Sequence, residues 1–176
     1  MIATENTAIQ KATERDFVIS RLLDAAPEVV FEAWTNPKSM ADWWGPRDFT
    51  NPVCRMDARP GGTYRIVMRS PEGAECPLKG VFREVVRPER LVMTMDHSEL
   101  GEDWQDLINP NRAKDDHNPA GEVVSTVTFE EIGARTKLTV RIRFDSPEIR
   151  NAFVKLGMNE GWSQSLDCLA ALLAKS

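Results

Sequence analysis

The feature of this sequence that most constrains its fold is a long helical stretch at the C-terminal end. Residues 146–176 open with Ser146 and Pro147, which suit the N-cap and the first position of a helix, and no proline follows. Apolar residues then recur at helical spacing. We therefore predict one long helix, with the rest of the chain folded as a curved sheet around it.

The apolar residues of this helix do not form one straight stripe. Those between positions 149 and 156 share one face, and those between 162 and 173 share another. The change falls between Gly157 and Gly161, and glycine inside a helix often marks a bend or a close approach. We expect a bend here, with space beside the helix for a bound group.

The composition is typical of one globular domain. The chain has 176 residues, a hydrophobic content of 41% and a net charge of −5. No cluster of Lys or Arg predicts a nucleic-acid partner, and no apolar stretch approaches the roughly 20 residues that span a bilayer. The polar segment 1–14 is expected to be a flexible tail without the features of a signal peptide, so residues 15–176 form the domain and a cytoplasmic location is expected.

The cysteines and histidines give no sign of a metal site or a disulfide framework. The three cysteines are odd in number and far apart, which favours buried, reduced thiols. His97 and His117 have no metal-ligand spacing to them. We therefore predict neither a metal nor a cofactor.

Alternating patterns and turn residues predict a strand, two short helices at 27–35 and 37–43, and then six more strands. The expected strands are 16–23, 50–58, 63–69, 78–86, 91–97, 123–130 and 136–144. Residues 98–122 have no period and are interpreted either as a lid or binding loop, or as an insertion packed by Trp104. This order indicates an α+β fold, in which a sheet that curves around one helix leaves room for a ligand.

Six stretches of the sequence together resemble one known family. They are RLLDAAPEVVFEAWTNP (21–37), WWGP (43–46), DARPGG (57–62), GVFRE (80–84), PERLV (88–92) and GWSQSLD (161–167). In this order they resemble homologues of the activator of heat-shock protein 90 ATPase. That family belongs to the START-like (SRPBCC) superfamily of polyketide cyclases, plant allergens and lipid-transfer domains.

The resemblance implies the helix-grip fold. In that fold a curved antiparallel sheet of seven strands surrounds a long C-terminal helix, with a hydrophobic cavity between them. Members of the superfamily bind sterols, lipids, hormones or polyketides, and some catalyse cyclisation or hydrolysis. Segment 98–122 is longer than the usual connection at this point, so the shape of the cavity mouth is left open.

Eight apolar residues are expected to line the cavity. They are Phe82, Met93, Met95, Trp104, Phe144, Phe153, Met158 and Trp162. Trp43 and Trp44 are interpreted as core residues, with an entrance to the cavity as the alternative. Asp57 and Arg59 are interpreted as a structural pair at a turn.

Three polar residues are candidates for the interior of the cavity. His97 follows the inward Leu91/Met93/Met95 face, either as a hydrogen-bonded residue at the rim or as an acid or base. Glu160 and Glu84 are expected either to pair with arginines or to be buried carboxylates with raised pKa values.

Three functions follow from these observations. We expect a protein that binds a small hydrophobic or amphipathic molecule, such as a lipid, polyketide or aromatic metabolite, between sheet and helix. The alternatives are a cyclase or hydrolase that uses His97, Glu84 or Glu160, and a co-chaperone-like interaction module. Whether the protein forms a homodimer is left open.

Overall fold

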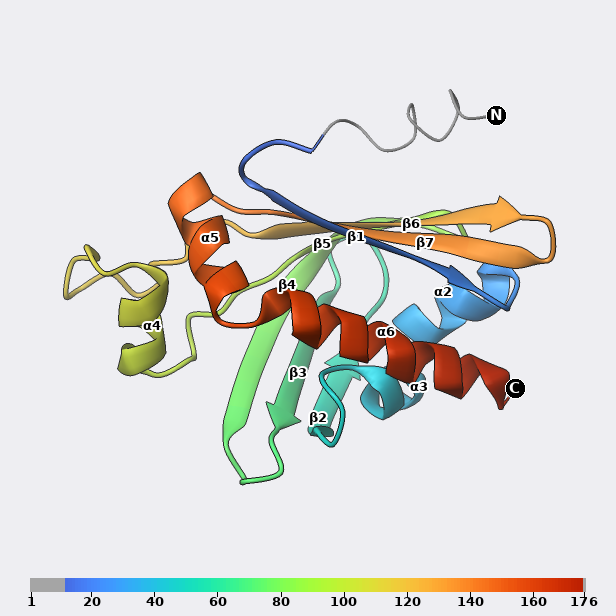
Figure 1. The fold of residues 1–176 in the computed structure, drawn as a ribbon, viewed down its shortest axis with the longest axis horizontal. Coiled ribbons are helices and arrows are strands. Elements are labelled where there is room, and N and C mark those ends of the chain that lie inside the picture. The colour runs from blue at the N-terminus through green and yellow to red at the C-terminus, as the bar shows by residue number, and fades with distance from the viewer. Residues whose placement is uncertain (1–11, 176) are drawn as a thin grey trace.

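The computed structural model describes residues 12–175 and has the predicted α+β architecture (Figure 1). In chain order the elements are β1 (Asp16–Leu23), α2 (Pro27–Thr35), α3 (Pro37–Trp43), β2 (Thr50–Met56), β3 (Thr63–Arg69), β4 (Glu75–Val86), β5 (Arg90–Thr94), α4 (Glu102–Ile108), β6 (Val124–Ile132), β7 (Arg135–Arg143), α5 (Pro147–Lys155) and α6 (Met158–Ala174). The expected tail, 1–14, lies largely outside the described residues. At its end Thr13 already donates two hydrogen bonds to the carboxylate of Asp16.

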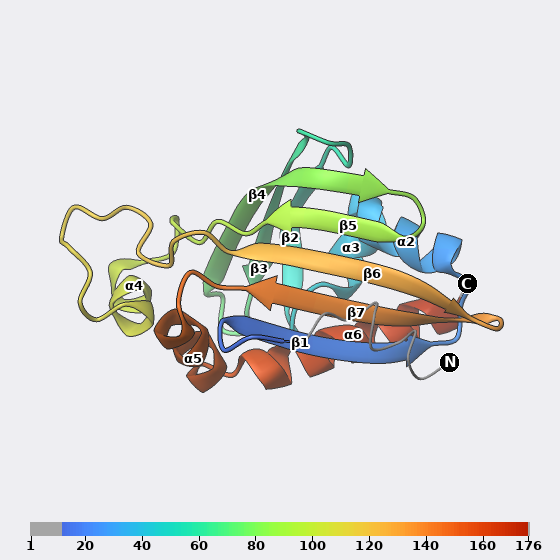
Figure 2. The same cartoon turned by 90° about the horizontal axis from the view of Figure 1, so that it is seen from above.

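Seven antiparallel strands form one curved sheet in the order β1-β7-β6-β5-β4-β3-β2. Figures 1 and 2 show α6 crossing one face of this sheet, with α2 and α3 on the same side. This arrangement is the helix-grip fold, and it confirms the fold class that the sequence predicts. None of the helices within residues 12–175 is long and apolar enough to cross a membrane.

The C-terminal stretch forms two helices rather than one. Ser146 caps α5 as expected, since its Oγ accepts a hydrogen bond from the backbone N–H of Ile149 at 3.2 Å. The break lies at Leu156 and Gly157, and Gly157 adopts φ +93°, which a side chain would strain. The predicted change of face is therefore correct in place, but it is a full interruption and not a bend within one helix.

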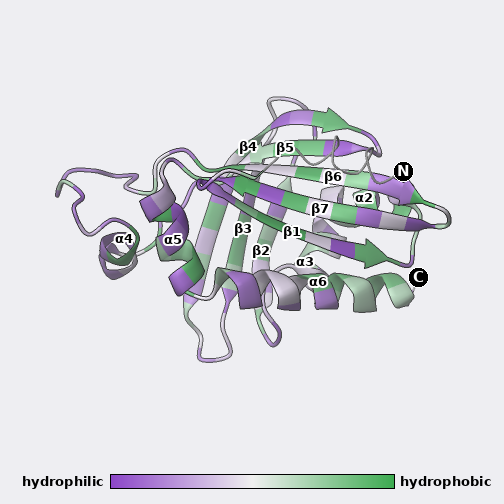
Figure 3. Cartoon of the chain, turned by 45° about the horizontal axis from the view of Figure 1, so that its top comes forward, coloured by the Kyte–Doolittle hydropathy of each residue, from purple (hydrophilic) through white to green (hydrophobic). Residues whose placement is uncertain are grey.

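The two helices are held by different means. α6 packs on α3, α2 and β1 and buries Trp162, Leu166, Leu169 and Leu173, whereas α5 buries Ile149. Figure 3 shows the same contrast, with α6 mostly hydrophobic towards its C-terminal end and α4 and α5 rich in hydrophilic residues.

Polar contacts anchor the start of β1 next to α5. The side chain of Asp16 is fully buried and accepts hydrogen bonds from Arg141 at 2.7 Å and Arg143 at 3.0 Å. Burial by itself raises the pKa of this carboxyl, but the hydrogen bonds from Arg143, Thr13 and Arg141 outweigh it and hold the pKa far below its usual range. Arg150 of α5 donates to the backbone carbonyl of Asp16 at 3.1 Å, which ties α5 to this ion pair.

The sequence predicts the inward face of β7 correctly, but it does not predict the helix within segment 98–122. Leu138, Val140 and Ile142 of β7 all point into the core, as their alternation predicts. Segment 98–122 is not without structure, because it contains α4. Ile108 and Ala120 pack this segment into the core at 2% and 1% exposure.

Candidate functional site

A hollow of about 270 Å³ opens between the sheet and the C-terminal helices. It lies on the α5 side of α6, where the break at Gly157 turns the chain. The residues around it are Trp44, Gly45, Pro46, Met68, Cys76, Pro77, Leu78, Met95, His97, Leu100, Trp104, Phe153, Leu156, Gly157, Met158, Gly161, Trp162 and Ser165. None of these side chains is charged at neutral pH, and His97 is the one among them that can take up a proton.

Aromatic rings form two walls of the hollow. On the α6 side, Trp44 packs against Trp162 edge-to-face with ring centroids 5.3 Å apart. On the α4 side, His97 stacks on Trp104 at 5.5 Å, and Phe153 meets both rings edge-on. Such tilted and offset arrangements are the favoured geometries of aromatic pairs, so the rings support one another as rigid walls.

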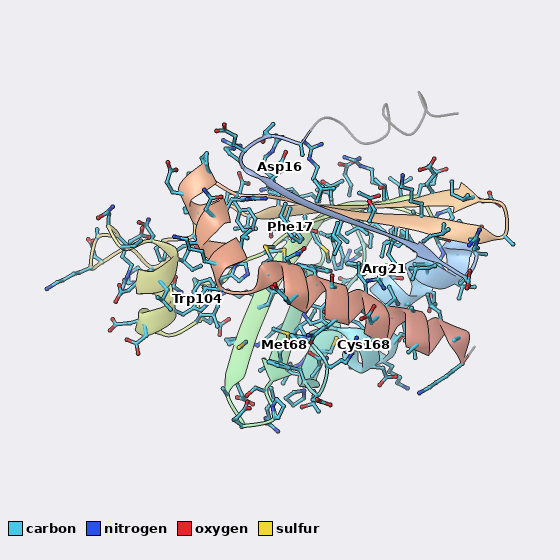
Figure 4. The ribbon with its side chains drawn as sticks, viewed as in Figure 1. Asp16, Phe17, Arg21, Met68, Trp104 and Cys168 are labelled. Carbon is cyan, nitrogen blue, oxygen red and sulfur yellow. The ribbon has the colours of Figure 1, made fainter. Side chains whose placement is uncertain are left out.

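Sulfur-bearing side chains complete the floor on the sheet. Met68 of β3, Cys76 of β4 and Met95, just after β5, all border the hollow. Figure 4 labels Met68 and Trp104, which reach the site from β3 and α4 respectively. Methionine is flexible and polarisable and makes favourable contacts with aromatic rings, so this floor can adapt to a flat apolar ligand.

His97 is the one imidazole of the hollow. Its Nδ1 is buried and has no hydrogen-bond partner among residues 12–175. No described residue hydrogen-bonds to Nε2 either, but Nε2 is not among the fully enclosed unpartnered atoms. Burial lowers the pKa of His97 to about 4, and the neighbouring Asp96 carboxylate offsets only part of this effect. The ring is therefore neutral at physiological pH.

The backbone at His97 is fixed by α4. Gln105, which is 5% exposed, donates from its side-chain amide to the carbonyl of His97 at 2.9 Å and to that of Leu100 at 3.2 Å. These bonds join α4 to the end of β5 and place Trp104 over the imidazole. The segment that the sequence leaves unpatterned thus positions the wall of the hollow on the α4 side.

The rim on the α3 side is tied to α6 by charge. Arg47 donates to Asp167 at 2.5 Å, and Arg21 of β1 donates to the other oxygen of the same carboxylate at 2.8 Å. The hydrogen bond from Arg21 is the main cause of a lowered pKa at Asp167. The backbone N–H of Arg47 also donates to Gln164 at 3.2 Å. These contacts hold the Gly45–Pro46 turn against the helix beside Gly161.

Five of the eight residues expected to line a cavity border the hollow. They are Met95, Trp104, Phe153, Met158 and Trp162. The other three, Phe82, Met93 and Phe144, lie in the solid core at 0%, 3% and 1% exposure and do not border it. Phe144 sits behind Phe153, with ring centroids 4.7 Å apart, which explains why an inward-facing residue is screened from the space.

Neither glutamate lies in the hollow. The pairing of β4 with β5 slips by one residue between Phe82 and Glu84, and such a bulge turns the following side chain to the other face. Glu84 is consequently exposed and pairs with Arg90 at 3.5 Å. Glu160 is exposed on the first turn of α6, so the buried carboxylates considered for both positions are wrong.

Several residues of the hollow were not predicted to line it. Met68 and Leu78 do lie on the inward faces that their alternation indicates, so a signal for them was present. Ser165 had a weaker signal, since only its packed position on α6 reveals it. Trp44, for which core and entrance were both considered, is buried in the core and also borders the hollow. Trp43 is core as expected, at 1% exposure, and its indole donates to the carbonyl of Ala33.

The fold and the hollow define a START-like, SRPBCC-type protein. The family model described as "Activator of Hsp90 ATPase homolog 1-like protein" matches residues 24–174, so this chain belongs to that family. No match was found among curated proteins.

Solved structures of similar fold come from several bacteria. Protein NE0264 from Nitrosomonas europaea is 25% identical, with a TM-score of 0.76 over 94% of this chain and 97% of that one. A protein from Rhodobacter sphaeroides has a TM-score of 0.78 at 21% identity, covering 95% and 97% of the two chains. The AHSA1 protein from Silicibacter pomeroyi is 25% identical, with a TM-score of 0.67 over 90% and 97%.

Proposed function

We propose that this protein binds a small, mainly apolar molecule in the hollow between the sheet and the C-terminal helices. The observation that carries the proposal is the hollow itself, which aromatic and sulfur-bearing side chains border, with no carboxylate, lysine or arginine from the described part of the chain. Binding sites for small molecules are concave, largely apolar and equipped with a few polar groups. The volume of about 270 Å³ suits a small ligand.

The lining residues favour binding over catalysis. An acid–base enzyme needs titratable groups that converge on the reacting atoms. Here His97 stands without a carboxylate partner inside the hollow, since Glu84 and Glu160 both lie outside it. An interaction module, in turn, would be favoured by a filled interior beside an exposed apolar patch, whereas this interior is open.

Segment 98–122 has a part in this proposal as the wall that closes the site on one side. Trp104 and Leu100 of this segment border the hollow, and Gln105 fastens it to the strand end.

A substitution at Gly161 tests the proposal without straining the backbone. A Cβ at this position would meet Pro46 at 3.9 Å, which is ordinary contact distance, so Gly161→Leu extends a side chain towards the hollow. Ala171→Leu, on the exposed face of the same helix, is the matched control. We expect naphthalene, titrated into ¹⁵N-labelled protein, to shift backbone amides of the lining residues in the wild type and the control but not in Gly161→Leu.

The result that overturns the proposal is equally concrete. If naphthalene and 2-naphthol leave the lining amides unshifted in the wild-type protein at their solubility limits, the hollow does not accept apolar molecules. Binding that persists unchanged in Gly161→Leu would place the ligand elsewhere on the surface.

A further inference from the structure

We propose that the ligand is an uncharged aromatic compound whose hydroxyl group hydrogen-bonds to Nε2 of His97. This inference rests on the proposed function and adds the chemical class of the ligand and the residue that selects it. Three features of the hollow carry it: the absence of charge, the ring-lined walls and the unpartnered imidazole.

The absence of charge argues against ions. A charged group that leaves water for an apolar site loses several kcal/mol of solvation unless a counter-charge replaces it. The neighbouring acids do not border the hollow: Glu160 is exposed, and Asp167 is engaged with Arg21 and Arg47. Asp96, next to His97 in the chain, accepts a hydrogen bond from the backbone N–H of Ser98 at 2.8 Å. A carboxylate or ammonium ligand would therefore lose solvation without compensation, whereas a neutral one would not.

The walls favour a flat aromatic body. Trp44 and Trp162 stand on one side, and His97, Trp104 and Phe153 on the other. Ring faces and edges on both sides, with methionine sulfur on the floor, offer an aromatic ligand the stacked, edge-on and sulfur contacts that such rings prefer. A saturated chain would fill the same space with fewer of these contacts.

The imidazole of His97 determines which polar group on the ligand is favoured. A neutral histidine has one nitrogen that donates and one that accepts a hydrogen bond. Because Nδ1 is sealed without a partner, Nε2 is the nitrogen that a ligand can reach without a rearrangement. A hydroxyl both donates and accepts, so it satisfies Nε2 in either tautomer, and a carbonyl or an ether satisfies one tautomer at most.

His97 is also held in place for this task. Its carbonyl is bound by Gln105, and its ring is fixed between Trp104 and Phe153 at centroid distances of 5.5 and 5.1 Å. A ring bound in the hollow shuts water out from Nε2, and a polar group that is buried without a partner costs free energy. A ligand hydroxyl that pairs with Nε2 avoids this cost, which gives the preference for a hydroxyl over an unsubstituted ring.

Three probes of nearly equal shape test the inference: naphthalene, 2-naphthol and 2-naphthoate. NMR titration of ¹⁵N-labelled protein at pH 7 gives the Kd of each and the amides that it shifts. We expect 2-naphthol to bind about five- to tenfold more tightly than naphthalene, which corresponds to one net hydrogen bond. We expect 2-naphthoate to bind more weakly than both.

Variants of His97 then assign the hydrogen bond to one nitrogen. The amide of a glutamine reaches about as far as Nε2, and that of an asparagine about as far as Nδ1. We expect His97→Gln to keep the preference for 2-naphthol, and His97→Asn and His97→Phe to lose it while still binding naphthalene. Ser165 also borders the hollow and is the competing hydrogen-bond partner, so Ser165→Ala tests whether the preference depends on α6 instead.

The outcomes separate this inference from the proposed function. Equal affinity for naphthalene and 2-naphthol, or a preference that survives in His97→Phe, overturns the role of His97 but leaves an apolar binding site. A preference that disappears in Ser165→Ala, and not in His97→Phe, moves the hydrogen bond to α6 and likewise overturns it. Tight binding of 2-naphthoate contradicts the exclusion of charge. No binding of any probe removes the proposed function as well.

Discussion

One half of the interface between the sheet and the helices is closely packed, and the other half contains the hollow. In the solid half, around α2, α3 and the C-terminal part of α6, Trp34, Trp43 and Leu166 are almost completely excluded from solvent. In the hollow half, around α4 and α5, the helices bury few residues and are held by hydrogen bonds such as those of Gln105 and Arg150. The difference indicates that close side-chain packing in the solid half stabilises the protein, whereas the hollow half leaves space between its side chains.

The boundary between the halves is a layer of indole rings. Trp162 of α6 stacks on Trp34 at 6.2 Å on its solid side and meets Trp44 at its hollow side. Because these rings are fixed by the solid half, they present a stable wall to the hollow. The anchoring half thus supplies the rigidity that a binding site needs.

The largest expected effect is a loss of stability when a side chain is removed from the solid half. Leu166→Ala removes a fully buried side chain from the solid half and should lower the free energy of unfolding by about 2–5 kcal/mol. Leu156→Ala, in the hollow half at 46% exposure, is the matched control and should lower it by less than about 0.5 kcal/mol. Urea denaturation measures both, and equal losses would show that the two halves are packed alike.

The next effect depends on pH and on His97. Its pKa is about 4 in the folded protein and near 6.5 when unfolded, so the unfolded state binds more protons between these values. The contribution of the neutral ring is complete above pH 6.5 and is lost as the pH falls towards 4, by up to about 3 kcal/mol. His97→Phe should remove this dependence. Parallel curves for the free energy of unfolding of the two proteins from pH 7 to 4 would contradict it.

The ion pair at Asp16 should have an intermediate effect. Asp16→Asn leaves Arg141 and Arg143 without the carboxylate that they share and should cost about 2 kcal/mol at pH 7, the loss of hydrogen bonds to a charged group. Since the folded pKa of Asp16 is lowered, its contribution is present above the unfolded pKa and is lost as the pH falls below it. Asp57→Asn, at an exposed pair with Arg59, is the control and should cost less than about 0.5 kcal/mol. Equal effects at both sites would mean that burial adds nothing at Asp16.

The smallest effects concern the two glycines at the boundary. Gly161 lies within α6, and a Cβ there would meet Pro46 at an ordinary contact distance of 3.9 Å, so Gly161→Ala should raise the free energy of unfolding by about 0.5–1 kcal/mol through helix propensity. Gly157 has φ +93°, so Gly157→Ala should lower it by about 1 kcal/mol despite equal room for a Cβ. Thermal unfolding measures the opposite signs, and a gain at both positions would mean that the helix break is not needed.

Much of this organisation was predictable from the sequence. The seven strands, the two short helices, the cap at Ser146 and an irregularity near Gly157 follow from alternation, helical spacing and the conformations that proline and glycine allow, whereas the division of the C-terminal stretch into two helices was not predicted. These are local rules, and they also identify the inward face of each strand, as for Leu138, Val140 and Ile142. The sequence by itself therefore determined the strands, the two short helices and the fold class, and it predicted space somewhere along the C-terminal stretch.

Only the tertiary structure decided where along the inward face the interior is filled and where it is open. Phe82 and Phe144 face inward just as Met95 does, yet other side chains cover them. The alternation of a strand shows on which face a residue lies, but not whether another side chain separates it from the hollow. A one-residue bulge moved Glu84 to the surface, and packing by Ile108 and Ala120 ordered a segment without any period. Space inside a protein is what the side chains of several distant segments leave unfilled, so it depends on contacts that no single stretch of sequence contains.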